Sequence, residues 1–153
     1  AFPERGFGTK EREYWEEHSA WQGIRELMEK VLCAYDWGEH FTALNLVAKP
    51  ALDECLREFG GIARHHGDAL LPLLADNQMR DSERSRRWST GLVEFCLSVD
   101  GNAEAINGWI KKWMPLTSEA VSTHCSDLPE NEGVAEAVMS KVEAFHRSLG
   151  LNS

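Results

Sequence analysis

One short motif in this chain has the spacing of a metal-ligand pair. Glu143 and His146 stand three residues apart in the segment Glu-Ala-Phe-His, and no other histidine follows a glutamate at that distance. On a helix this spacing puts a carboxylate and an imidazole on one face. Ferritin-like di-iron bundles use two such pairs, with a further glutamate from each of two other helices. We interpret this single pair as solvent-facing residues that flank the core residues Val142 and Phe145.

Metal binding by the pair is the alternative interpretation, and it requires self-association. Two copies of the chain would bring together two pairs of Glu143 and His146, and Glu17 or Glu26 could supply bridging carboxylates. This alternative predicts stoichiometric iron in the purified protein. The preferred interpretation predicts no metal ligand in this chain.

The remaining residue patterns do not indicate catalysis. His65 and His66 are neighbours and cannot chelate from one helix face, while Asp36, four residues before His40, is better placed to cap a helix. The sequence has no dinucleotide-binding or P-loop glycine pattern and no Gly-x-Ser-x-Gly turn. We therefore predict no catalytic and no cofactor-binding residue.

Composition restricts the class of protein. The chain has 153 residues, enough for one domain, and a formal net charge of −9, which is unfavourable for binding a nucleic acid backbone. No apolar run reaches the roughly 20 residues that cross a bilayer, and the N-terminus lacks a signal-peptide pattern. The four cysteines are scattered without a C-x-x-C motif. We expect a reduced, cytoplasmic protein that binds neither nucleic acid nor membrane.

Tryptophan is unusually frequent, with six residues in this short chain. Tryptophan anchors both cores and protein interfaces because it buries a large area and carries one polar atom. We expect five of them to fill the core or contact a partner: Trp21, Trp37, Trp88, Trp109 and Trp113.

The elements that would position these residues are helices. Apolar residues follow i, i+3, i+4 spacing from Trp21 to Tyr35, and Asp36 is placed as the N-cap of a second helix, with Glu39 completing a capping box. Pro50 should kink or restart the second helix, which should end at Gly60 and Gly61.

The rest of the chain continues the helical pattern. We expect helical segments at 62–97, which Pro72 could divide, and from Ala103 onward, bent at Pro115. Together these features predict a single all-α domain over 1–153. Its parts are an extended segment at 1–14, helices at 15–125, an acidic linker at 126–133 and a last helix at 134–150.

Four stretches resemble a known family. They are YDWGEHFTALNLVAKP at 35–50, GIARHHGDALLPLL at 61–74, RSRRWSTGLV at 84–93 and NAEAINGWIKKWMPLTSEA at 102–120. In this order they resemble the beta subunit of bacterial multicomponent monooxygenase hydroxylases, in the branch that acts on toluene and phenol. The resemblance implies a ferritin-like helical bundle without a metal site of its own, followed here by an extra C-terminal helix.

The resemblance also implies partners. Such subunits pair with a homologous alpha subunit that holds the di-iron centre, and with a small gamma subunit, in an NADH-dependent complex. The resemblance extends over only the C-terminal half of these beta subunits. The first helix pair of the bundle would therefore be missing from this chain, and an apolar face should be open. A separate chain could supply the missing half.

The resulting hypothesis is a non-catalytic structural subunit. It would support the iron-bearing alpha subunit in O2-dependent hydroxylation of an aromatic hydrocarbon or phenol. The alternatives are the self-associating metal protein described above and a stand-alone helical adaptor.

Overall fold

The computed structural model describes residues 10–152, and these fold into helices joined by short turns, without any strand. The all-α prediction is therefore confirmed for this part of the chain. The helices are α1 (Glu11–Glu17), α2 (Ser19–Leu32), α3 (Trp37–Phe41), η2 (Thr42–Ala48), α4 (Lys49–His65), α5 (Leu70–Leu97), α6 (Asn102–Cys125) and α7 (Val134–Ser148). Of the expected extended segment at 1–14, residues 1–9 lie outside the description, while residues 11–14 belong to α1.

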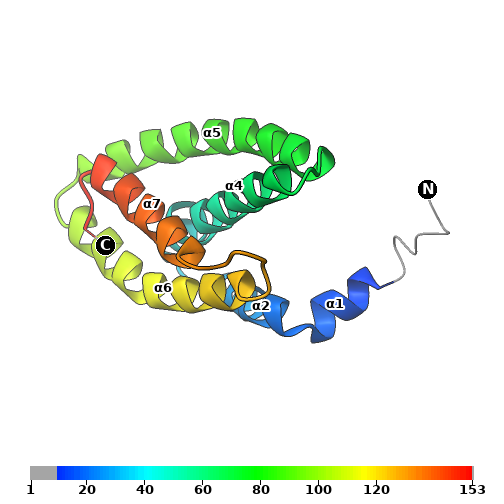
Figure 1. Ribbon diagram of the computed structural model, residues 1–153. Helices are drawn as coiled ribbons and strands as arrows, with labels where there is room; N and C mark the ends of the chain where they lie inside the picture. The colour runs from blue at the N-terminus through cyan, green and yellow to red at the C-terminus, as the bar shows by residue number, and fades with distance from the viewer. Residues whose placement is uncertain (1–9, 153) are drawn as a thin grey trace.

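The most extensive packing between helices joins α4 to α5 and α2 to α6. Figure 1 shows α5 as a long arc with α4 beneath it, and α7 between α4 and α6. On the other side α2 packs along α6. One apolar cluster centres on η2 and includes Leu46, Val93 and Ile110, each fully buried. A second cluster joins α4, α6 and α7. Burial of each such aliphatic side chain stabilises the fold by about 1.5–3 kcal/mol.

The first predicted helix is shorter than its apolar pattern suggested. Ile24, Leu27 and Val31 form its buried stripe, as the spacing predicted. The helix ends at Leu32, however, and both Leu32 and Tyr35 are exposed rather than packed against the core. Asp36 is the N-cap of α3, as predicted, because its Oδ1 accepts hydrogen bonds from the backbone N–H groups of Gly38 and Glu39 at 2.8 and 3.0 Å.

A π-helix replaces the kink expected at Pro50. The seven residues of η2 run directly into α4, and the backbone N–H of Lys49 donates to the Leu44 carbonyl, five residues earlier. Pro50 then lies in the first turn of α4, directly after the π turn, and removes one N–H donor from the continuous helical segment. The wider turn lets the chain continue through the proline without a break.

The prediction that Gly60 and Gly61 end a helix is wrong. Helix α4 continues through both glycines to His65. Gly60 is buried, and a Cβ added there would lie 2.8 Å from the Cβ of Ala75 on α5. The glycine therefore permits a close approach of two helices instead of ending one.

Two other prolines leave their helices intact. Helix α5 is one unbroken element because Pro72 falls in its first turn. Just before it, the Asp68 side chain accepts hydrogen bonds from the N–H groups of Leu70 and Leu71. Helix α6 runs unbroken past Pro115. The segment 126–133 joins α6 to α7 through turns, and Gly150, with φ of +73°, follows α7.

Candidate partner interface

A row of large apolar side chains is exposed along α3 and α5. Trp88, Phe95 and Val99 stand seven and four residues apart on and just after α5, so they share one side of the helix. Trp88 is 60% exposed and Phe95 is 72% exposed. The Phe41 ring of the neighbouring helical segment lies 5.7 Å from the Trp88 ring in an edge-to-face arrangement. We call the surface formed by Trp37, Phe41, Trp88, Phe95 and Val99 the aromatic face.

The aromatic face contains a pocket with a volume of about 200 Å³. Trp37 and Phe41 form one side of it, Val93 and Cys96 of α5 another, and Trp109 of α6 a third. Trp37 itself is 70% exposed. An indole ring this exposed beside an apolar pocket is typical of a surface that a partner covers.

Helix α3 is fixed in place by contacts to α6. The Oε1 of Glu39 accepts hydrogen bonds from Lys112 Nζ at 2.6 Å and from the buried indole Nε1 of Trp113 at 2.9 Å. The Glu39 side chain therefore contacts α6 instead of closing the predicted capping box. Gly38 lies against the Trp109 ring, where an added Cβ would be 3.0 Å from the ring. These contacts hold Trp37 at the rim of the pocket.

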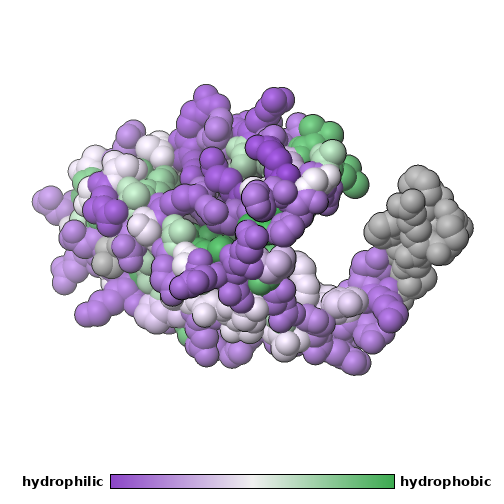
Figure 2. Space-filling view, viewed as in Figure 1, coloured by the Kyte–Doolittle hydropathy of each residue, from purple (hydrophilic) through white to green (hydrophobic). Residues whose placement is uncertain are grey.

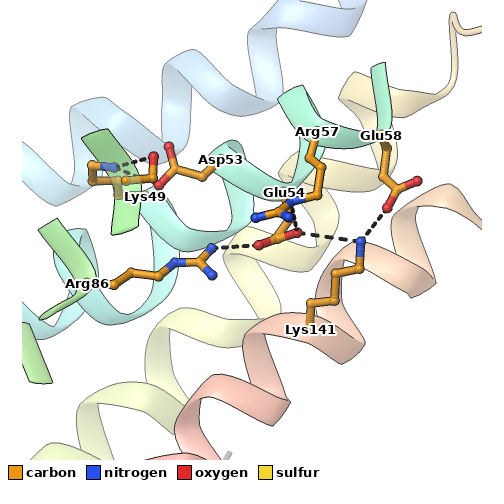
Figure 3. A network of polar contacts seen from close by, with 8 residues as sticks. Lys49, Asp53, Glu54, Arg57, Glu58, Arg86 and Lys141 are labelled. Atoms are coloured by element: carbon orange, nitrogen blue, oxygen red, sulfur yellow. Dashed lines mark hydrogen bonds and ion pairs between the residues drawn. The ribbon is translucent and has the colours of Figure 1, made fainter. Parts of the chain in front are cut away.

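A buried ion network fixes α5 relative to α4 and α7 (Figure 3). The Glu54 side chain is almost fully buried and accepts a hydrogen bond from Arg86 of α5 at 2.7 Å. Its second oxygen lies 3.1 Å from Arg57 and 3.5 Å from Lys141 of α7. The two buried carboxylate oxygens thus contact three cationic side chains. These contacts compensate for the cost of removing the carboxylate from water.

A second ion pair lies on the same side of α4. Lys49 donates to the Asp53 carboxylate at 2.6 Å and to the Ser82 hydroxyl of α5 at 3.3 Å. Asp53 is also buried. Glu54 contacts α5 directly through Arg86, and Lys49 links Asp53 to Ser82 of α5. The orientation of α5 is therefore specified by polar contacts as well as by packing. The aromatic face on its outer side is thereby held on a rigid support.

Two further groups of exposed apolar side chains lie away from the aromatic face. Leu70, Leu73 and Leu74 are exposed at the first turns of α5, and Figure 2 shows apolar side chains at this end of the molecule. Trp15 and Trp21 lie with their rings 6.1 Å apart near the beginning of the described chain, and the Trp21 ring is 4.5 Å from His124.

The five tryptophans singled out from the sequence separate into four environments. Trp37 and Trp88 belong to the aromatic face, and Trp21 is partly exposed beside His124. Trp109 is partly buried against the core and lines the pocket. Trp113 is only 3% exposed and is therefore a core residue rather than an interface anchor.

The interpretation of Glu143 and His146 as a solvent-facing pair is wrong for the histidine. His146 is 0% exposed, and its Nε2 lies 2.8 Å from the carbonyl oxygen of Leu46, which makes Nε2 the protonated nitrogen. Glu143 is half-exposed and pairs with Arg147 at 3.7 Å. The two side chains occupy different environments.

Two other histidines are also engaged within the protein. The Nδ1 atoms of His40 and His124 lie 3.0 Å from the carbonyl oxygens of Val31 and Ala20 respectively. Across residues 10–152 no three histidine, cysteine, aspartate or glutamate side chains come together as a possible metal site. In the same residues, no helix is both long and apolar enough to traverse a bilayer.

Burial alters the ionisation of several groups in the core. Removal from water lowers the pKa of His146 and of His124, and the adjacent carbonyl oxygens only partly oppose this effect. The neighbouring Cys125 thiol, together with burial, raises the pKa of Cys55. All four cysteines are free thiols.

Comparison with known proteins decides the family. Residues 1–100 match the family of methane, phenol and alkene hydroxylases. The chain belongs to this family. Together with the relatives described next, this family confirms the resemblance to hydroxylase beta subunits inferred from the sequence.

Individual relatives extend this result. The chain is 48% identical over 128 residues to the hydroxylase beta subunit of the toluene-4-monooxygenase system of Ectopseudomonas mendocina, covering 83% of this chain and 39% of that protein. It is 27% identical over 110 residues to the oxygenase component DmpL of phenol 2-monooxygenase from Pseudomonas sp. strain CF600, covering 71% of this chain and 33% of that protein.

A solved structure supports the fold of the family. A chain of toluene 4-monooxygenase, with toluene bound in its resting active site, superposes with a TM-score of 0.76 and 42% identity, covering 91% of this chain and 43% of that chain. The ferritin-like helical fold is therefore confirmed. The chain spans about two fifths of the length of these relatives.

Proposed function

We propose that this hydroxylase-family chain is a non-catalytic structural subunit of a multicomponent di-iron monooxygenase. The reaction would be the O2-dependent hydroxylation of an aromatic hydrocarbon or phenol, with the di-iron centre in a partner alpha subunit. The observation that carries the proposal is the aromatic face, a rigidly supported surface of exposed rings. The 48% identical relative is a hydroxylase beta subunit, which supports the same role.

The aromatic face favours a stable contact over a transient one. A surface with several exposed aromatic side chains is uncommon on monomers, and tryptophan is among the residues that contribute most to binding energy. The pocket between Trp37 and Trp109 would receive an apolar side chain of the partner. The formal charge of −9 would favour a partner surface that is basic around its apolar centre.

The partners that we infer are an iron-bearing alpha subunit and a small gamma subunit. The relatives are more than twice as long as this chain. We infer that a further polypeptide segment, on this chain or on a separate one, supplies the remaining helices of the bundle. The free cysteines accord with a cytoplasmic location for the complex.

Co-purification tests the role of the aromatic face. Trp37→Glu and Trp88→Glu place a carboxylate where we expect a desolvated contact, whereas Leu73→Glu makes the same change at the exposed start of α5. We expect both tryptophan variants to lose association with the iron-bearing subunit and Leu73→Glu to retain it. Circular dichroism and the melting temperature should be unchanged in all three, because the altered side chains are exposed. Normal association of both tryptophan variants would refute the proposal.

The isolated chain provides a second test. With an uncovered aromatic face, we expect self-association or aggregation at micromolar concentration, measured by light scattering. A monodisperse monomer with cooperative unfolding would argue against a partner-dependent subunit. Iron analysis of the same sample addresses the metal-binding alternative, which requires one or more iron atoms per chain.

A further inference from the structure

The carbonyl oxygen of Leu46 lies where the helical hydrogen-bond pattern is interrupted. In an α-helix this carbonyl would accept a hydrogen bond from the residue four positions later. That residue is Pro50, which has no N–H. Leu46 also lies inside the π-helix η2, just before the chain returns to α-helical geometry at Lys49. A buried carbonyl that lacks its α-helical donor can be satisfied by a donor from elsewhere in the fold.

His146 supplies that donor from α7. Its Nε2 lies 2.8 Å from the Leu46 carbonyl oxygen, across a separation of 100 residues. The other ring nitrogen, Nδ1, is buried and has no hydrogen-bond partner among the described residues. The imidazole is therefore held in one tautomer, as a neutral ring with a single N–H that is fully used.

We propose that His146 is a neutral-imidazole latch, which replaces the hydrogen bond that Pro50 cannot make and holds α7 on η2, and that protonation of its Nδ1 opens the latch. Protonation would create a second N–H donor at a buried nitrogen that has no hydrogen-bond partner among the described residues. A buried charged group without a partner is strongly unfavourable. Protonation of His146 would therefore displace α7 from η2.

The charged groups around the latch do not remove this cost. On α7 itself, Glu143 and Arg147 pair with each other and have opposing effects on the imidazole. Segment η2 contains no ionisable residue, and the buried residues of α6 include no Asp, Glu, Lys or Arg. From α5, the Arg86 guanidinium lies over the ring of Phe145, next to His146, and it pairs with Glu54 of α4. The other buried carboxylate of α4, Asp53, pairs with Lys49.

Opening of the latch would expose the second apolar cluster. Val138, Met139 and Val142 of α7 pack in this cluster against α4 and α6. Lys141 of the same helix would leave Glu54 and Glu58. Opening of the latch would thus disrupt both an apolar contact and an ion network. Because burial lowers the pKa of His146, opening would occur at a pH below the ordinary pKa of histidine.

Hydrogen–deuterium exchange on the full-length chain in its assembly tests the latch. The readout is the protection of peptides covering 42–50 and 134–149, corrected for the pH dependence of intrinsic exchange. Between pH 7.5 and 5.5 we expect wild-type protection of these peptides to fall by about tenfold. His146→Gln keeps an N–H near the Leu46 carbonyl but cannot be protonated, so its protection should stay constant. His124→Gln, which removes a partly buried imidazole whose pKa is also lowered, should retain the wild-type pH response in these peptides.

A double-mutant cycle tests the link to Pro50. At pH 7.5, His146→Phe keeps a ring but loses the donor, and protection should fall by about fivefold. Pro50→Ala restores a backbone N–H that can reach the Leu46 carbonyl, so the same His146→Phe change should have a smaller effect in that background. Equal effects in both backgrounds, or a pH response of His146→Gln that matches the wild type, would overturn the proposal. If His146→Phe does not fold, the His146→Gln comparison still decides the outcome.

Discussion

Gly60 and Ala75 bring α4 and α5 into closer contact than any larger residue at position 60 would allow. A Cβ on residue 60 would lie 2.8 Å from the Ala75 Cβ, a separation that such atoms do not adopt without a shift of one helix. A Cβ on the neighbouring residue, Gly61, would meet no other element of the fold within 4 Å. The two adjacent glycines therefore have opposite roles in the same helix.

These two positions form a matched pair for mutagenesis. We expect Gly60→Ala to destabilise the protein by about 1–3 kcal/mol because α4 and α5 must separate. Gly61→Ala should stabilise it by about 0.5–1 kcal/mol because alanine favours the helix and meets no neighbour. Urea denaturation of both variants measures the difference. A destabilised Gly61→Ala variant would show that the space around this residue is filled in the assembly.

Removal of the Glu54 carboxylate should be costly. Glu54→Gln leaves Arg86 and Lys141 without their shared anion, and we expect a loss of about 2–3 kcal/mol in the free energy of unfolding. Glu58→Gln, which alters a more exposed partner of Lys141, should cost less than about 1 kcal/mol. Chemical denaturation at pH 7.5 compares them, and equal losses would contradict a special role for the buried carboxylate.

Stability should decrease as the pH falls below the ordinary pKa of histidine. The folded-state pKa of both His124 and His146 is lowered by burial, so protons bind more readily to the unfolded chain. The stabilisation is fully present above pH 6.5 and is lost progressively below it, by at most about 1.4 kcal/mol per pH unit for each imidazole. Denaturation midpoints at pH 7.5, 6.5 and 5.5 measure the slope. The double variant His124→Gln and His146→Gln should have a flatter profile than the wild type.

The four thiols should react at different rates. Cys33 is exposed, whereas Cys55 and Cys125 are buried and Cys96 is intermediate. Because burial and the neighbouring Cys125 thiol raise the pKa of Cys55, it should form little thiolate at neutral pH. Timed alkylation with mass spectrometry should label Cys33 first and Cys55 only on unfolding. Early labelling of Cys55 would indicate that α4 and α6 open readily.

Local signals predicted much of the fold. The spacing of Ile24, Leu27 and Val31 identified the buried side of α2, and Asp36 was recognisable as a cap because aspartate at that position satisfies free backbone N–H groups. A helix end was wrongly predicted at Gly60 and Gly61 because glycine commonly ends helices. Here the need for close packing against Ala75 determined the residue instead.

The features missed by sequence reasoning depend on distant parts of the chain. The partner of Glu39 is 74 residues away at Trp113, and no local pattern reveals such a contact. His146 was expected at the surface with Glu143, flanking the core residues Val142 and Phe145, but the imidazole is buried where it donates to the Leu46 carbonyl. A signal did exist in the sequence, since Pro50 identifies a carbonyl that lacks its usual donor.

The π-helix also has a consequence for changes in chain length. A π turn is equivalent to one extra residue in an α-helix, and each residue corresponds to about 100° of rotation. Deletion of one residue between 42 and 48 can therefore be absorbed by a change from π to α geometry, which keeps the following helix in phase. Glu54 would still face Arg86, and Gly60 would still meet Ala75. Homologous chains that share these contacts should therefore tolerate one residue fewer in this segment, which would then be α-helical.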